Sequence, residues 1–267
     1  MTKIVVTDLD GTLLNEKSEI SQENYEAIKK LKEKGIIFGI ASGRAVGVIN
    51  QIIKDHQIME MVDFLIGFNG AEIYDFREKV AITIPQLQKD MIKNIIDIFS
   101  ELDVVCAVHE GAELYANKWN PSIQVEANLN KYKLIIKENL KEFIQKDYPK
   151  LMITGEQEYL TMIENNIISS IKGEYNAFRS HQNFYEFVAK NVSKGSAIEK
   201  YCQIHGFQAE EVMAFGDNLN DYEMIQYAGV GVAMDNAVEP LKSIAQIIAR
   251  HHADHGFAQV IEDRFMV

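Results

Sequence analysis

Cysteine is scarce in this chain: Cys106 and Cys202 are the only two in 267 residues. Two cysteines are too few to build a disulfide framework, and both lie in segments with an apolar pattern. Such cysteines are usually buried free thiols, so we expect reduced side chains and a cytoplasmic location.

Long apolar runs and excess positive charge are also missing. No stretch of about 18 apolar residues occurs, which predicts no membrane-spanning helix. The first residues enter an apolar strand pattern without a basic and apolar leader, so we expect no signal peptide. There are 27 Lys and Arg residues against 39 Asp and Glu residues, a net charge of −12. This balance argues against binding to nucleic acid or to an anionic membrane, but it allows a small anionic substrate beside a metal.

The most informative segment lies near the N-terminus, where an apolar run, residues 4–7, leads into Asp8, Asp10 and Gly11. Buried parallel strands have such runs, and residues just beyond them lie in the crevice where open α/β sheets bind ligands. Side chains two residues apart can face the same point. The repulsion between the Asp8 and Asp10 carboxylates would be relieved by a cation or a shared proton, and this favours a divalent metal at the site. The alternative is an ordinary turn, because Asp and Gly also suit turn backbone.

Helix and strand patterns alternate in both terminal parts of the chain. Ser21 and Ser193 each begin a predicted helix, and Gly35 and Gly206 end them. The predicted buried strands are residues 4–7, 36–40, 62–68, 212–215 and 230–234. This alternation predicts an α/β fold, a Rossmann-like parallel sheet covered by helices.

The middle of the chain has a different pattern. Segments 113–116 and 184–188 alternate polar and apolar side chains, and the spacing of Leu87, Met91 and Ile95 predicts a helix. Alternation is typical of an antiparallel sheet with one solvent-exposed face. We therefore predict a core domain formed by residues 1–84 and 189–267, with an inserted α+β cap domain formed by residues 85–188.

Polar residues of four kinds follow the predicted strands or begin a helix. They are Asp8 and Asp10; Ser42 and Gly43; residues 193–195; and residues 217–221. Three of the acids, Asp8, Asp10 and Asp217, supply the oxygens that a hard cation such as Mg²⁺ prefers. The candidate donors to a phosphoryl group are the Ser42 hydroxyl, the backbone N–H groups of Leu9 and Gly43, the Asn220 amide and the Lys194 ammonium. The positive end of the helix that begins after Ser193 adds to them.

Each of these signals has a simpler explanation. Ser42 and Gly43 suit an ordinary turn, Lys194 suits a solvated first turn of a helix, and Asp217 suits a helix cap. Their occurrence together, each after a strand or at a helix start, predicts phosphoryl-transfer chemistry.

These motifs resemble those of the haloacid dehalogenase superfamily, in its Cof-type group of sugar-phosphate phosphatases with a large inserted cap. The matching segments are residues 8–14 for the first motif, 40–44 for the second, 194–195 for the third and 216–221 for the fourth. Segments 68–71 and 232–237 resemble secondary signatures of the group. The resemblance covers nearly the whole core, whereas the cap matches only in size and position.

The resemblance implies Mg²⁺-dependent hydrolysis of small phosphomonoesters through an aspartyl phosphate. It implies that Asp8 is the nucleophile and that Asp10 acts first as general acid and then as base. The implied metal ligands are Asp8, the Asp10 backbone carbonyl and Asp217. The implied phosphate-binding residues are Leu9, Ser42, Gly43, Lys194 and Asn220. Asp221 is implied to orient Lys194 or a metal-bound water, and the cap to close over the site and select a small phosphorylated substrate.

Two other functions fit the same residues. A phosphomutase would share the nucleophile and the metal, but it would return the phosphoryl group to a sugar. A regulator that binds Mg²⁺ or phosphate without catalysis would be expected to lack Asp8 or Asp10, and both are present. We expect a monomer or a homodimer.

Residues 251–258 depart from the family pattern. His251, His252 and His255 stand where the family usually has an Asn-rich acidic turn. Three histidines in five residues suggest a transition-metal site, although a solvated loop is the favoured explanation.

Overall fold

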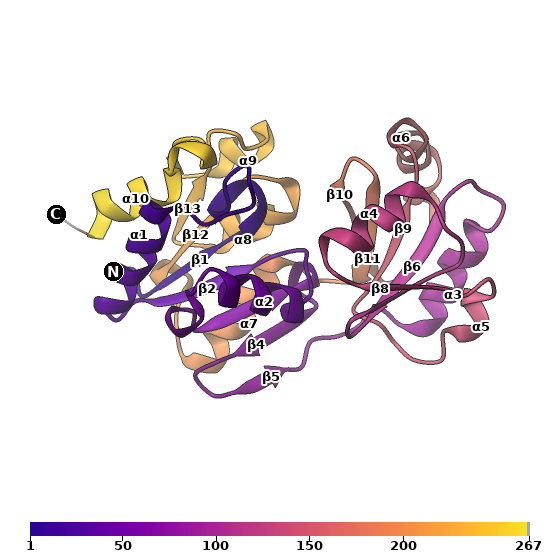
Figure 1. Cartoon of the computed structure of the whole chain (residues 1–267), viewed down its shortest axis with the longest axis horizontal. Coiled ribbons are helices and arrows are strands. Elements are labelled where there is room, and N and C mark those ends of the chain that lie inside the picture. The colour runs from indigo at the N-terminus through magenta and orange to yellow at the C-terminus, as the bar shows by residue number, and fades with distance from the viewer. Residues whose placement is uncertain (266–267) are drawn as a thin grey trace. The chain divides into compact units, whose positions relative to one another are not determined.

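A computed structural model describes residues 1–265 of the chain (Figure 1). The chain divides into two compact units, one formed by Met1–Ile84 and the segment from Ser193 onward, the other by Pro85–Val192. Residues 189–192 lie in the second unit, past the predicted boundary at residue 188. The Asn176 side chain donates a hydrogen bond to the Val192 carbonyl, which holds this segment to the second unit.

An eight-stranded sheet forms the centre of the first unit, in the order β14-β13-β12-β1-β2-β3-β4-β5. The strands are β1 (Ile4–Thr7), β2 (Ile37–Ala41), β3 (Phe64–Gly67), β4 (Glu72–Asp75), β5 (Val80–Ile82), β12 (Val212–Gly216), β13 (Val230–Ala233) and β14 (Ile247–Ile248). Pairing is parallel from β14 to β3 and antiparallel at β4 and β5. The predicted parallel α/β core is confirmed, with an antiparallel extension at one edge.

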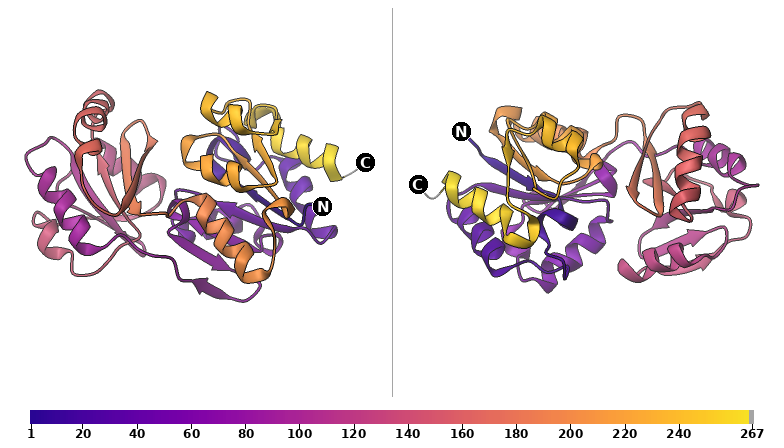
Figure 2. Two further views of the ribbon diagram at one scale, coloured as in Figure 1. Left: turned by 180° about the vertical axis from the view of Figure 1, so that it is seen from behind. Right: turned by 90° about the horizontal axis from the view of Figure 1, so that it is seen from above.

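Helices cover both faces of this sheet (Figure 2). They are α1 (Gln22–Glu33), α2 (Val46–Asp55), α7 (Lys194–His205), α8 (Tyr222–Tyr227), α9 (Glu239–Ile244) and α10 (Gly256–Phe265). Val5 and Phe38 pack with α1, α2 and α10 on one face, and Ile4 and Val6 pack with α7, α8 and α9 on the other. Because both faces are buried, the strands keep the unbroken apolar runs seen in the sequence.

The predicted helix starts at Ser21 and Ser193 are confirmed. The Ser21 hydroxyl accepts a hydrogen bond from the Asn24 N–H at the start of α1. At the start of α7, Ser193 and Ser196 form a reciprocal capping box, in which each hydroxyl accepts from the other residue's N–H. Two orphan donors are satisfied there, so the position of the first turn of α7 is fixed.

The second unit contains a six-stranded sheet in the order β10-β11-β9-β6-β7-β8. Its elements are α3 (Lys89–Ile98), β6 (Val105–Glu110), β7 (Glu113–Ala116), α4 (Pro121–Leu129), β8 (Lys133–Ile136), α5 (Leu140–Phe143), β9 (Lys150–Thr154), α6 (Gln157–Asn166), β10 (Tyr175–His181) and β11 (Phe184–Ala189). Pairing is antiparallel except between β7 and β8. Helices α3, α5 and α6 pack with Cys106 and Leu151 on one face.

The prediction of a solvent-exposed face is wrong for β11, and in β7 it is met only by half-buried positions. Alternate residues of β7 are only half-buried, but β9 and β11 are buried along their whole length. The polar positions of these strands meet each other: Lys150 Nζ donates to Glu186 Oε1 at 2.8 Å, and both side chains are buried. The alternation of polar and apolar residues in β11 therefore reflects a buried ion pair and not a solvent-exposed face.

Two expectations about composition can be compared with the described residues. Cys106 and Cys202 are both free and buried, as predicted. Within residues 1–265, the structure has no helix with the length and apolar character needed to cross a bilayer.

His109 is a buried titratable side chain of the second unit. Its imidazole is buried beside Lys150, with Nε2 3.4 Å from Glu126 of α4. Burial, together with the Lys150 charge, lowers the pKa of His109 below its ordinary value. The unfolded chain, with a His pKa of about 6.5, then binds the proton more readily than the folded protein. The free energy of unfolding is therefore highest above that value and falls as the pH drops toward the folded pKa.

We expect wild-type protein to lose more stability than His109→Gln between about pH 8 and about pH 5, because glutamine does not titrate. Urea unfolding followed by the fluorescence of Trp119, the single tryptophan, reports on the second unit. Parallel stability profiles of the two proteins over this range would contradict the prediction.

Candidate functional site

Segments far apart in the sequence meet at the carboxyl end of the parallel strands of the first unit. Asp8 follows β1 and Asp217 follows β12, and these strands are neighbours in the sheet. On its other side β1 pairs with β2, which leads into Ser42. After β1 the chain continues to β2 on one side, and after β12 it continues to β13 on the other side. Such a switch point leaves a crevice beyond the strand ends.

Lys194 lies between two carboxylates at this point. Its Nζ donates hydrogen bonds to Asp8 Oδ1 and to Asp221 Oδ1, both at 2.6 Å. Lys194 and Asp221 are completely buried, and Asp8 is 5% exposed. Because Lys194 is the first residue of α7, the capping box at Ser193 holds its backbone in place.

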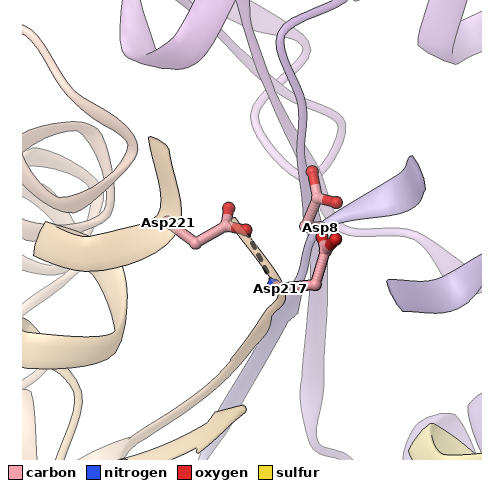
Figure 3. A group of neighbouring side chains, drawn as sticks. All are labelled: Asp8, Asp217 and Asp221. Atoms are coloured by element: carbon pink, nitrogen blue, oxygen red, sulfur yellow. Dashed lines mark hydrogen bonds between the residues drawn. The ribbon is translucent and has the colours of Figure 1, made fainter. Parts of the chain in front are cut away.

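Three acidic side chains, Asp8, Asp217 and Asp221, form a compact group (Figure 3). Asp8, Asp217 and Asp221 each offer a carboxylate oxygen, and these oxygens lie within 4.8 Å of one another. The Asp221 Oδ2 also accepts the backbone N–H groups of Asp217 at 3.0 Å and Asn218 at 3.1 Å. Since both oxygens of Asp221 already have donors, Asp8 and Asp217 are the better ligands for a metal, and Asp221 is suited to orienting Lys194.

Burial and like charge shift the titration of this group. Burial raises the pKa of the Asp8 carboxyl well above its usual range; Lys194 opposes the rise, and Asp221 and Asp217 add to it. Burial and the Asp221 carboxylate raise the pKa of Asp217 to about 7. Burial by itself would lower the pKa of Lys194, but Asp221 and Asp8 outweigh it and raise that pKa.

The acidic group carries more negative charge than Lys194 balances. Three carboxylates against one ammonium leave an excess of two negative charges when all are ionised. A divalent cation would offset this excess, and hard cations prefer such carboxylate oxygens. The residues present therefore fit a divalent cation, which would favour the ionised forms of Asp8 and Asp217.

The predicted donors lie in the turns around this group. Ser42 is buried, and its carbonyl accepts a hydrogen bond from the Asn69 N–H at 3.0 Å. The Asn220 side chain donates to Asn69 Oδ1 at 2.9 Å. Asn69 thus joins the turn at Ser42 to the turn at Asn220. A Cβ at Gly43 would lie 3.2 Å from the Asn69 amide.

The backbone around Asn69 has an uncommon conformation, which is strained at Phe68. Phe68, Asn69 and Gly70 have successive positive φ values of 47°, 55° and 108°. A Cβ at residue 70 would come within 2.1 Å of the Ser193 carbonyl oxygen, so only glycine fits there. The segment therefore lies directly against the start of α7. Residues 68–71 match a secondary signature of the family, but no local pattern predicts a role for Asn69, because its contacts depend on this backbone conformation.

The carboxylate of Asp10 points to Arg44 instead of joining the acidic group. Arg44 Nε donates to Asp10 Oδ2 and Arg44 Nη2 to Asp10 Oδ1, both at 2.8 Å. The Asp10 side chain is 50% exposed. The predicted metal ligand, its backbone carbonyl, stays a prediction. Arg44 belongs to the second motif, but no pattern in the sequence predicts its ion pair with Asp10.

Two further residues of the first motif touch Asp217. The Thr12 hydroxyl donates to Asp217 Oδ1 at 3.2 Å. Gly11 has a φ of 81°, and a Cβ there would lie 2.5 Å from Asp217 Oδ2. Both belong to the tight turn Leu9–Leu13 that follows Asp8. This turn, which begins at the predicted phosphate-binding residue Leu9, is therefore packed directly against the acidic group.

The three clustered histidines point to separate partners. His252 Nδ1 lies 2.7 Å from the Leu14 carbonyl, and His251 Nδ1 accepts the Ala253 N–H at 3.2 Å. His255 Nδ1 lies 3.5 Å from Glu23. In the part of the chain that the structure describes, these histidines do not form a group able to hold a metal. The segment has structural contacts, which agrees with the favoured explanation of a loop, and the transition-metal alternative gains no support from these residues.

Known proteins are similar to this chain over nearly its whole length. A family model described as haloacid dehalogenase-like hydrolase matches residues 5–261. A haloacid dehalogenase-like hydrolase from Bacteroides thetaiotaomicron is 32% identical, with a TM-score of 0.88, over 99% of this chain and 100% of that one. TM0651 from Thermotoga maritima is 30% identical, with a TM-score of 0.84, over 98% and 97%. YitU of Bacillus subtilis, a 5-amino-6-(5-phospho-D-ribitylamino)uracil phosphatase, is 25% identical over 98% of this chain and 97% of its own length.

We expect Lys194→Met to lower the free energy of unfolding by about 3 kcal/mol or more, because it leaves two buried carboxylates without their cation. Urea unfolding measures the loss. Lys200→Met is the matched control, since Lys200 lies on the same helix and is exposed. A Lys194→Met protein as stable as this control would show that the buried ammonium does not hold the site together.

Proposed function

The chain belongs to the haloacid dehalogenase-like hydrolases and is a phosphoric monoester hydrolase, and we propose that it hydrolyses small phosphomonoesters with Mg²⁺ through an aspartyl phosphate on Asp8. The observation that carries this proposal is the contact of one buried lysine with Asp8 and Asp221, with Asp217 in the same acidic group. Phosphoryl transfer to a carboxylate brings like charges together, and positive groups fixed at that point lower its barrier.

Asp8 and Asp217 are the side chains that would hold the metal, with the Asp10 carbonyl as the predicted third protein ligand. A bound Mg²⁺ would neutralise charge on the phosphoryl oxygens and on the attacking carboxylate. The Thr12 hydroxyl and Gly11 keep the Asp217 carboxylate in one orientation, so this ligand is preorganised.

In the first step, a carboxylate oxygen of Asp8 forms a bond to phosphorus, and the bond from phosphorus to the alcohol oxygen breaks. The Lys194 ammonium remains beside the Asp8 carboxylate, and its positive charge offsets the repulsion between carboxylate and phosphate. Ser42, Asn220 and the N–H groups of Leu9 and Gly43 are the proposed donors to the phosphoryl oxygens.

Asp10 is the proposed proton carrier. It protonates the departing alcohol oxygen and then takes a proton from the water that attacks the aspartyl phosphate. In the second step the bond from phosphorus to Asp8 breaks, and inorganic phosphate leaves. Because the Asp10 carboxylate is paired with Arg44 in the structure, it has to turn away from that guanidinium to reach the alcohol. Its half-exposed position leaves room for this rotation.

Sugar phosphates and related phosphorylated metabolites are the proposed substrates. The relative YitU acts on a compound with a phosphorylated ribityl chain, which makes phosphorylated polyols a class to include in the test. A phosphomutase would use the same nucleophile, but it would release a rearranged sugar phosphate in place of inorganic phosphate.

We expect a panel of hexose phosphates, pentose phosphates and phosphorylated ribityl compounds to include substrates that release inorganic phosphate with Mg²⁺. EDTA should abolish release and added Mg²⁺ should restore it, because the acidic group needs a cation to accept a phosphate dianion. Phosphate release and kcat/KM are measured for each compound. Rearranged sugar phosphate without free phosphate would indicate a mutase, and full activity in EDTA would exclude the metal.

We expect Asp8→Asn to reduce kcat by about three orders of magnitude or more, because the amide cannot form the phosphoryl bond. Asparagine keeps the side-chain shape and an oxygen for Lys194, so the melting temperature serves as the check on folding. A folded Asp8→Asn protein that keeps more than a few per cent of wild-type turnover would refute the nucleophile assignment.

A further inference from the structure

The turn that carries Asp10 is held from behind by side chains outside the four motifs. Leu9–Leu13 closes on itself through a hydrogen bond from the Leu14 N–H to the Leu9 carbonyl. Three backbone carbonyls in or next to this turn accept hydrogen bonds from side chains distant in the sequence. They are Gly11, from Asn236 at 2.8 Å; Leu13, from Asn24 at 2.9 Å; and Leu14, from His252 at 2.7 Å. These contacts fix the turn relative to the rest of the first unit.

Asn236 occupies the central position among these contacts. Its Nδ2 donates to the Gly11 carbonyl, and its Oδ1 accepts the His252 N–H at 3.1 Å. A backbone N–H can only donate, so this second bond prevents the amide from flipping and keeps Nδ2 directed at Gly11. The bond from the His252 imidazole to Leu14 holds residue 252 beside the same turn.

The loop that contains Asn236 is also bonded to the strand end that carries Asp217. The Met234 N–H donates to the Gly216 carbonyl at 3.0 Å, and the Val238 N–H donates to the Asp217 carbonyl at 2.9 Å. One loop therefore holds the backbone of Asp217 on one side and the Gly11 carbonyl on the other. Gly11 and the Asp217 carboxylate are in direct contact, as the 2.5 Å approach of a Cβ to Oδ2 shows.

We propose that Asn236 is a positioning residue of the cation site, which holds the Gly11 turn against the Asp217 carboxylate. This role rests on the proposed function, because it concerns the same metal-dependent site. Asn236 touches neither Asp8 nor the acidic oxygens; it acts through Gly11. Loss of its amide frees the Gly11 carbonyl, so the turn moves away from Asp217 and the ligand loses its preorganisation. Partners outside the ligand set commonly change metal affinity by about 10-fold to 100-fold.

The test compares Asn236→Ala with Asn24→Ala. Asn24 is a matched control, since its amide likewise bridges the turn to the C-terminal segment, donating to Leu13 and accepting the Ala258 N–H at 3.1 Å. It does not contact Gly11. Calorimetric titration of Mg²⁺ into each protein without substrate measures affinity. Hydrogen exchange at Gly11 and Thr12 in metal-free protein measures opening of the turn, and the melting temperature measures general stability.

We expect Asn236→Ala to bind Mg²⁺ about tenfold more weakly and to exchange faster at Gly11 and Thr12. Saturating Mg²⁺ should restore its kcat, with an unchanged KM for substrate. Asn24→Ala should lower the melting temperature, because Asn24 is buried, while Mg²⁺ affinity stays within about twofold of wild type.

Equal loss of affinity in both variants, or wild-type affinity in Asn236→Ala, would overturn the positioning role. Wild-type protein that hydrolyses phosphomonoesters without binding Mg²⁺ would overturn the metal site itself and leave the phosphatase activity standing. Failure of the positioning role is detected by comparing the Mg²⁺ affinities of the variants, whereas failure of the metal site is detected in the wild-type protein. The two outcomes are therefore distinguishable.

Discussion

A buried ammonium between two buried carboxylates is the constraint on which the site depends. Lys194 joins Asp8, at the end of the first strand, to Asp221, in the turn before α8. An unpaired charge in this position would be costly, so the three side chains are stable only together. Their arrangement also requires β1 next to β12 and α7 capped at Ser193, which links the geometry of the acidic group to the sheet topology.

Local sequence was sufficient where one element determines a residue's position. The apolar run before Asp8 and the Ser193 cap before Lys194 define a strand end and a helix start, and those points meet in the fold. The glycine in the first motif is also explained locally, since residue 11 needs a positive φ. These features follow from strand period, capping chemistry and backbone conformation, which neighbouring residues reveal.

Contacts between residues far apart in the chain cannot be predicted from local sequence patterns. Arg44 with Asp10, Asn69 with Asn220 and Asn236 with Gly11 join residues whose separation in the sequence contains no periodic signal. The second unit shows the same limit in another form. A polar residue at every second position of a strand has the same pattern whether it faces water or a buried partner. The pattern of residues 184–188 therefore predicts a solvent-exposed face, although Glu186 pairs with the buried Lys150.

The three successive positive φ values at Phe68, Asn69 and Gly70 carry a consequence for the evolution of this protein. Left-handed backbone costs roughly 1 kcal/mol or more at a residue such as Phe68, whereas glycine and asparagine tolerate it. A substitution that relaxed Phe68 into ordinary backbone would therefore raise thermostability while moving the Asn69 amide that faces Asn220. Heat-adapted homologues would be expected to keep the left-handed backbone at these positions and to gain their stability from other parts of the structure.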